Sequence, residues 1–135
     1  MTGNFVVPEE YRKPESVEIA VKLLEHYLEN KDSENRGLIT YGDLCKKLSF
    51  EMNPRTIERN LGDISFACKE NYLPPISALV VNKDEGLPGA GFFAAYFPEK
   101  KGVDRIDVWM DIFKKIHAYQ DWSKVLEAYR KIDIV

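Results

Sequence analysis

The chain has 135 residues, of which 44% are apolar and 30% charged, so it is long enough for one domain with a real core and has the composition of a soluble globular protein. Its net charge of −3 lacks the basic excess from which nucleic-acid binders draw much of their affinity. No signal-peptide pattern opens the chain and no apolar run reaches the roughly 20 residues of a membrane helix, so we expect a cytoplasmic protein that does not bind membranes.

The N-terminal part is expected to be an arm followed by a helix. Residues 1–13 are predicted to be extended, because Pro8 and Pro14 disfavour a helix across this segment. Over residues 15–30 the apolar side chains recur at helical spacing, which predicts an amphipathic helix.

Two short helices are expected next. Thr40 is a good N-cap residue, and Asp43 three positions later resembles a capping box. Asn53 followed by Pro54 is a second start signal. Gly62 inside this second helix indicates a kink or a close backbone approach. The residues of the second helix expected to face the core are Ile57, Leu61, Ile64 and Cys68.

A two-stranded β-hairpin is predicted after these helices. Residues 76–82 are predicted to form a strand with apolar side chains on both of its faces, and residues 92–96 are predicted to form the returning strand. The charged and glycine-rich connection between them, including Gly86, is expected to form an irregular wing.

Two C-terminal helices complete the predicted fold, and Asp121 is expected to cap the second. The order of elements predicts an α+β fold, a winged-helix-like helix-turn-helix with its hairpin, flanked by an N-terminal helix and two C-terminal helices. A single domain, 1–135, is predicted, with the winged-helix core over 38–97 and the C-terminal helices over 103–131.

A candidate nucleic-acid interface lies on the second helix. Arg55 and Arg59 are one turn apart and suit phosphate or groove contacts. The alternative is a solvated helix face on which Arg59 pairs with Asp63. Glu58 beside these arginines would oppose phosphate, and from Tyr41 to Asn71 five basic residues balance five acidic ones. The residues proposed to contact nucleic acid are Tyr41, Lys46, Lys47, Arg55, Thr56, Arg59 and Asn60.

These segments resemble the C-terminal domain of the alkylguanine-DNA alkyltransferases and the alkyltransferase-like proteins. Residues 40–44 (Thr-Tyr-Gly-Asp-Leu) are similar to the segment that opens one helix in that family, and 55–62 to the recognition segment that enters the minor groove. Leu79-Val80-Val81 resembles the end of the strand that carries the family's reactive cysteine. The resemblance implies that Tyr41 assists nucleotide flipping and that Arg55 fills the vacated space in the stack.

The family's chemistry does not transfer to this chain. The position of the reactive cysteine falls near Ser77, and alkyl transfer needs an activated thiolate. We therefore expect a non-enzymatic module that binds double-stranded DNA, with no catalytic residues, no metal and no cofactor.

Two other functions remain open from the sequence. The acidic total and the aromatic-rich C-terminal helices also suit a small protein-interaction module, such as an inhibitor or immunity-type protein, that binds a partner protein. An enzyme would require a cleft lined by Ser77 and His117, with a base and an oxyanion hole that the sequence does not show. Leu87 to Gly91 lacks the lysine of a phosphate-binding loop, and the residues after it are expected to form a strand instead of the helix that such a loop requires.

Overall fold

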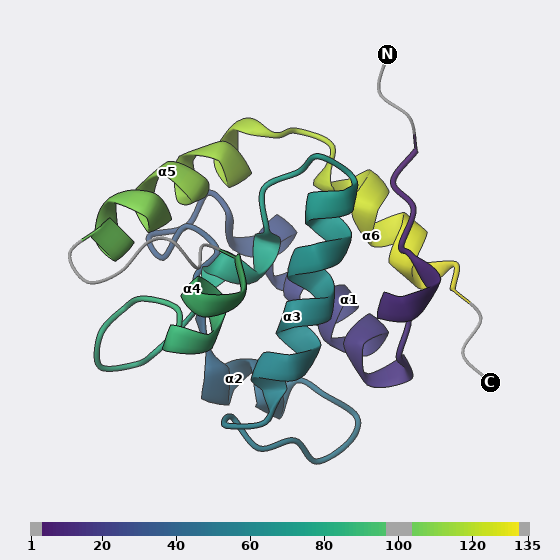
Figure 1. Cartoon of the computed structure of the whole chain (residues 1–135), viewed down its shortest axis with the longest axis horizontal. Coiled ribbons are helices and arrows are strands. Elements are labelled where there is room, and N and C mark those ends of the chain that lie inside the picture. The colour runs from purple at the N-terminus through teal and green to yellow at the C-terminus, as the bar shows by residue number, and fades with distance from the viewer. Residues whose placement is uncertain (1–3, 97–103, 133–135) are drawn as a thin grey trace.

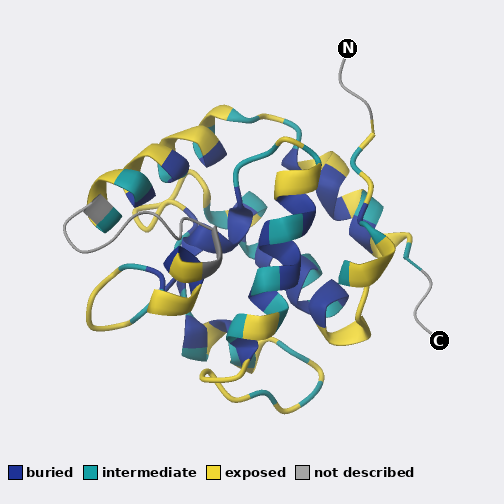
Figure 2. Ribbon diagram, viewed as in Figure 1, coloured by how far each residue is buried: buried dark blue, intermediate teal, exposed yellow. Residues whose placement is uncertain are grey.

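The computed structural model describes residues 4–96 and 104–132, over which the chain is mostly helical with one small sheet (Figure 1). The α+β class predicted from the sequence is confirmed at this coarse level. Buried residues gather in the interior, and the peripheral helices show exposed outer faces (Figure 2).

The first helix, α1 (Pro14–Asn30), lies where a helix is predicted over 15–30. Pro14 occupies the first helical position, where a missing N–H costs no hydrogen bond. The helix packs against α3 (Ile57–Glu70) and α6 (Trp122–Arg130). Its buried face consists of Ser16, Val17, Ile19, Ala20, Leu23, Leu24 and Tyr27.

The arm that precedes α1 is tied to the far end of α3. Asn71 accepts a hydrogen bond from the Val6 N–H and donates one to the Val6 carbonyl. The arm is not extended throughout its described part, because η1 (Glu9–Tyr11) forms one 3₁₀ turn between the two prolines. The turn buries no side chain, so the spacing of apolar residues does not predict it.

The helices α2 (Tyr41–Lys46) and α3 follow in the predicted order, but α3 begins later than predicted. The expected start at Pro54 is wrong, because residues 54–56 form a turn. The Asn53 side chain accepts a hydrogen bond from the Arg55 N–H, so it stabilises this turn instead of capping the helix. The connection between α2 and α3 is therefore longer than the three or four residues usual in a helix-turn-helix.

The predicted two-stranded hairpin is wrong. The two strands, β1 (Ile39–Thr40) and β2 (Val80–Val81), run parallel, with Ile39 opposite Val80. The residues that precede β2 form the 3₁₀ helix η2 (Ile76–Leu79). Every residue from Ile76 to Val81 is buried, so this run has no face exposed to solvent. Without such a face, the order of apolar residues does not distinguish a strand from a helix.

The segment predicted as the returning strand is a helix, α4 (Ala90–Tyr96), which packs against α3. Phe92 and Phe93 are both buried although they are adjacent, an arrangement that a half-buried strand does not allow. The wing assigned to the connection is therefore wrong as well. Residues 82–89 form a loop that leads from β2 into a helix.

The C-terminal helices α5 (Asp104–Ala118) and α6 lie where two helices are predicted. Trp109 on α5 donates an indole hydrogen bond to the Ala78 carbonyl of η2, and Trp122 on α6 donates one to the Ile116 carbonyl. Both rings are buried and both N–H groups are satisfied, so they anchor α5 and α6 to the core. Asp121 occupies the N-cap position of α6 without a side-chain capping hydrogen bond.

Both cysteines are free thiols; Cys68 is buried and Cys45 is half-buried. No helix within the described ranges is both long and apolar enough to span a bilayer. The same ranges contain no group of three histidine, cysteine or acidic side chains placed to hold a metal ion.

Candidate nucleic-acid interface

The first part of the candidate interface is the end of α2. Thr40 caps this helix as predicted, since its hydroxyl accepts a hydrogen bond from the Asp43 N–H (3.1 Å). The short helix then brings Lys46 and Lys47 to its C-terminal end, where both are exposed. The Lys46 Nζ lies 3.8 Å from the Asp43 Oδ1, and this exposed ion pair contributes little to stability. The Lys47 ammonium has no ion-pair partner in the described part of the chain.

The second part is the turn that leads into α3. Asn53 organises this turn, because its side chain accepts from the Arg55 N–H (2.8 Å) and its carbonyl from the Thr56 hydroxyl (3.0 Å). Arg55 therefore lies in the turn before the helix, and Arg59 lies in the first turn of α3. Both arginines are exposed, and neither guanidinium has a hydrogen-bond or ion-pair partner among the residues that the structure describes.

Of the two acids on α3 that lie near the arginines in sequence, Asp63 forms its contacts with α1 and the residue before it. Asp63 is only 9% exposed and accepts a hydrogen bond from the buried Ser16 hydroxyl (2.7 Å). Its second partner is Lys13, whose ammonium lies 3.4 Å away. The Asn60 amide donates to the same Ser16 hydroxyl (2.9 Å). The predicted alternative, an Arg59–Asp63 pair, is therefore wrong, since the Asp63 carboxylate points into the α1–α3 contact.

The other acid, Glu58, faces the core side of α3. Tyr41 is 8% exposed, and its hydroxyl donates to the Glu58 carboxylate and accepts from the Gly89 N–H (2.8 Å). Burial and the hydrogen bond to Glu58 raise the pKa of Tyr41 well above its usual range, so the phenol stays protonated. The Tyr41–Glu58–Gly89 cluster, as we call these three residues, joins α2, α3 and the loop before α4.

The glycines before and within α4 make room for this cluster. A Cβ placed on Gly91 would collide with Glu58 Oε2, and one on Gly89 would lie 3.3 Å from Glu58 Oε1. Gly62 differs, because nothing lies within 4 Å of a Cβ built there. The close approach predicted at Gly62 is therefore wrong. The glycines at which another segment comes close are Gly89 and Gly91, which belong to the segment predicted as the wing.

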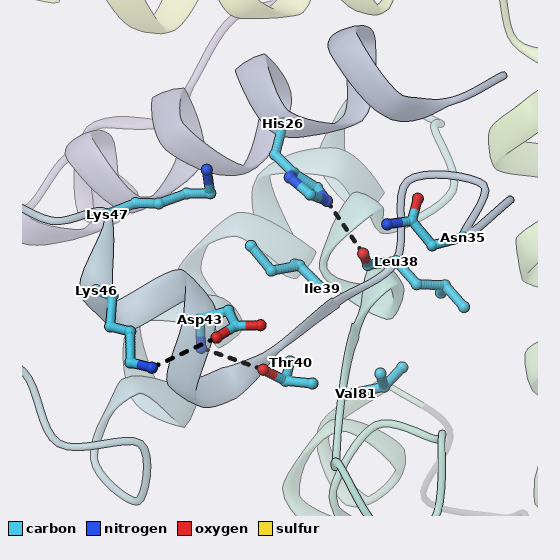
Figure 3. Close-up of a pocket in the computed structure, with 9 residues that line it drawn as sticks. All are labelled: His26, Asn35, Leu38, Ile39, Thr40, Asp43, Lys46, Lys47 and Val81. Atoms are coloured by element: carbon cyan, nitrogen blue, oxygen red, sulfur yellow. Dashed lines mark hydrogen bonds and ion pairs between the residues drawn. The ribbon is translucent and has the colours of Figure 1, made fainter. Parts of the chain in front are cut away.

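A groove of about 600 Å³ opens on the other side of α2 (Figure 3). Leu38, Ile39 and Val81 form its apolar lining, and Lys46 and Lys47 lie on its α2 side. His26 closes the α1 side, where its Nε2 donates to the Leu38 carbonyl (3.0 Å). Because the carbonyl can only accept, this contact assigns the ring proton to Nε2. The imidazole thus holds the segment before β1 against α1 and is not a free ligand.

The structure separates the seven predicted contact residues into two groups. The exposed group, available to a ligand, is Lys46, Lys47, Arg55, Thr56 and Arg59. Tyr41 and Asn60 are held inside the fold by hydrogen bonds, so the expectation that they contact nucleic acid is not supported. The sequence showed which residues are polar, but it did not show which of them satisfy one another.

The residues considered for catalysis are not brought together. Ser77 is buried and shares a hydrogen bond with Ser65 beside the Tyr41–Glu58–Gly89 cluster. His117 lines a different cavity, where its ring packs on Tyr27. Nucleophilic catalysis requires the base within hydrogen-bond reach of the serine, and among the described residues Ser77 and His117 line two different cavities.

Comparisons of the chain with protein-family models, with curated proteins and with solved structures found no match.

Proposed function

We propose that the chain binds double-stranded DNA through the turn before α3 and the adjacent ends of α2 and α3. The contact residues in this proposal are Lys46, Lys47, Arg55 and Arg59, which would bind phosphates from one side of the duplex. A hairpin wing and a nucleotide-flipping tyrosine are not part of the proposal.

The observation that carries the proposal is the orientation of the acids on α3. Over the segment from Tyr41 to Asn71, the positive and negative charges cancel when they are summed along the sequence. Next to Arg55 and Arg59 the balance changes, because Asp63 is buried against Ser16 and Lys13 and Glu58 is turned toward Tyr41. The other three acids of the segment, Asp43, Glu51 and Glu70, are exposed. Arg55 and Arg59 remain exposed without an acidic partner within the described residues. Such segregation allows an acidic protein to present a local basic surface.

The mode of binding follows from the residues that remain. Arginine and lysine contacts to phosphate position a protein on DNA without selecting a base sequence. The two amides near the arginines already form hydrogen bonds, since Asn60 donates to Ser16 and the side-chain oxygen of the exposed Asn53 accepts from the Arg55 N–H. We therefore expect weak, salt-sensitive binding with little sequence preference.

Titration of a fluorescently labelled random-sequence duplex tests the proposal. Each phosphate contact contributes about 0.9 to the slope of log affinity against log salt, so Arg55→Ala plus Arg59→Ala should lower that slope by about two units. At low salt the same double variant should bind roughly tenfold more weakly or worse.

The control is Lys124→Ala plus Lys131→Ala, which removes two positive charges from α6 and the residue after it. This variant has the same net charge as the arginine double variant and should bind like the unaltered protein. Equal losses in the two variants would show that net charge alone is responsible. No retention of duplex at low salt, together with a nuclease-resistant protein partner, would instead favour the protein-interaction module.

A further inference from the structure

The loop of residues 31–37, which joins α1 to β1, packs against α5. The Arg36 guanidinium lies over the Phe113 ring, 5.7 Å from the ring centroid, and the Arg36 backbone lies close to the His117 imidazole. Phe113 and His117 are one turn apart on α5, and their ring centroids are 4.6 Å apart. We call this arrangement the Arg36–Phe113–His117 contact. It joins the loop to the C-terminal half of α5.

The backbone of the loop is strained where it makes this contact. Arg36 has a φ of 55°, in the left-handed region that residues with a Cβ rarely adopt, and Gly37 follows with a φ of 87°. Gly37 lies so close to α1 that a Cβ built on it would be 2.7 Å from the Tyr27 ring. A strained residue keeps such a conformation only while the surrounding contacts hold it there. Weakening the contact with α5 therefore favours release of the loop.

The His117 imidazole is placed where a positive charge is poorly stabilised. Its Nε2 is buried and forms no hydrogen bond with a described residue. Its Nδ1 lies 3.5 Å from the Tyr27 hydroxyl, at the outer limit of a hydrogen bond. A protonated imidazole has two N–H donors, and a buried donor without an acceptor costs free energy. The neutral ring is therefore the form that suits this position.

Two cations and one acid among the described residues act on His117. Burial lowers the pKa of the imidazole most, and the charges of Arg36 and Lys31 lower it further. The Arg36 backbone and the Asp32 carboxylate raise the pKa, but they do not cancel this shift. The other polar and aromatic groups around the same cavity carry no charge at neutral pH, and they are Tyr27 from α1, Tyr119 and Gln120 after α5, and Trp122 from α6.

We propose that His117 is a pH-sensitive switch, whose neutral ring holds the loop of residues 31–37 on α5 and whose protonation releases it. Protonation places a second positive charge beside the Arg36 guanidinium, and the strained backbone then favours the released loop. Because the pKa of the docked ring is lowered, the contact is at full strength above the usual histidine pKa of about 6.5. It is lost as the pH falls through the lower pKa of the docked ring. This inference does not depend on DNA binding.

An NMR titration of the full chain from about pH 8 to about pH 5 tests the switch. The imidazole signals of His117 should titrate below the usual histidine range. In the docked loop the Tyr27 ring shifts the Gly37 resonances, and these should move toward the values of an unstructured glycine with the same midpoint as His117. The ratio of released to docked loop should rise by at most tenfold per pH unit, since one proton is taken up. Circular dichroism should stay constant over this range, because the helices remain folded.

The second histidine of the chain provides the matched control. His26 donates to the Leu38 carbonyl at the end of the same loop, so its own titration is the competing explanation for a shift of Gly37. His26→Gln should leave the response of Gly37 to pH in place, and it also assigns the remaining imidazole signal to His117. His117→Gln cannot titrate at this position and should remove the response.

Three results would overturn the proposal. The first is a Gly37 resonance that stays in its docked position while His117 becomes protonated. The second is a response of Gly37 that persists in His117→Gln or disappears in His26→Gln. The third is a His117 imidazole that titrates within or above the usual histidine range. The first and third results are read without any substitution at position 117, so they remain decisive if His117→Gln does not fold.

Discussion

At the scale of single residues, polar side chains in this chain are distinguished by what they bond to and not by their type. Tyr41 and Asn60 have the chemistry of nucleic-acid contacts, yet the fold uses both as internal hydrogen-bonding groups. Glu58 and Asp63 have the chemistry that opposes such contacts, yet both are turned away from the arginines. The net effect is to leave the guanidinium groups of Arg55 and Arg59 exposed and without a hydrogen-bond or ion-pair partner among the described residues.

The Tyr41–Glu58–Gly89 cluster supplies the residue-scale prediction. Tyr41→Phe removes a hydroxyl that both donates and accepts, and it leaves the Glu58 carboxylate and the Gly89 N–H without that partner. We expect the free energy of unfolding to fall by about 1–3 kcal/mol, measured by denaturant unfolding.

Tyr72→Phe is the matched control, because Tyr72 is 96% exposed and its hydroxyl has no hydrogen bond with the described residues. That substitution should change the stability by less than about 0.5 kcal/mol. If Tyr41→Phe had an equally small effect, the cluster would not contribute to stability.

The cap of α2 and the core residues of α3 could be predicted from the sequence, because they depend on neighbours within a few turns of one helix, whereas the predicted start of α3 at Asn53 and Pro54 is wrong. Thr40 caps α2, and Ile57, Leu61, Ile64 and Cys68 are buried as the helical spacing indicates. The inward direction of Glu58 could not be predicted in this way. It depends on Tyr41 and Gly89, which reach it only when three separate segments have come together.

At the scale of elements, the principal difference between expectation and structure is α4, a helix where a strand is predicted. Aromatic residues favour strands in general, but burial against a neighbouring element overrides such a preference. Two adjacent buried phenylalanines are compatible with a helix enclosed on more than one side. The parallel sheet was missed for a related reason, since two-residue strands are too short to show alternation.

The glycines of α3 and α4 give a prediction at this scale. Gly91→Ala should be destabilising relative to Gly62→Ala by about 1–2 kcal/mol in denaturant unfolding, although both glycines lie in helices. At Gly62 the new methyl group meets no atom within 4 Å, so the substitution gains the helix propensity of alanine. At Gly91 it displaces the Glu58 carboxylate.

A double-mutant cycle identifies the cause of the Gly91 effect. In the Tyr41→Phe background the hydrogen bond to Glu58 is already absent, so the cost of Gly91→Ala should shrink. An unchanged cost in that background would assign the effect to the α4 backbone and not to the Tyr41–Glu58–Gly89 cluster.

At the scale of the whole molecule, Cys68 reports on global unfolding. It lies in the interior on α3, and burial raises the pKa of its thiol to about 12, so the native state contains almost no reactive thiolate. In a Cys45→Ala variant, labelling of Cys68 by a thiol reagent should follow the same denaturant transition as circular dichroism.

The complementary variant, Cys68→Ala, retains the half-buried Cys45 near the end of the short helix α2. Its labelling should begin at lower denaturant concentration, because local opening suffices to expose it. Rapid labelling of Cys68 under native conditions would show that α3 separates from the core without global unfolding.

The parallel pairing of β1 with β2 has a topological consequence for the proposed interface. Parallel strands need a crossover connection, and here that connection contains α2, the turn at residues 54–56, all of α3 and η2. Both ends of the crossover are anchored side by side in one sheet, so the arginines are carried on a closed loop rather than on a free appendage. The sheet, although each of its strands is only two residues long, thereby holds together the two ends of the connection that carries Arg55 and Arg59.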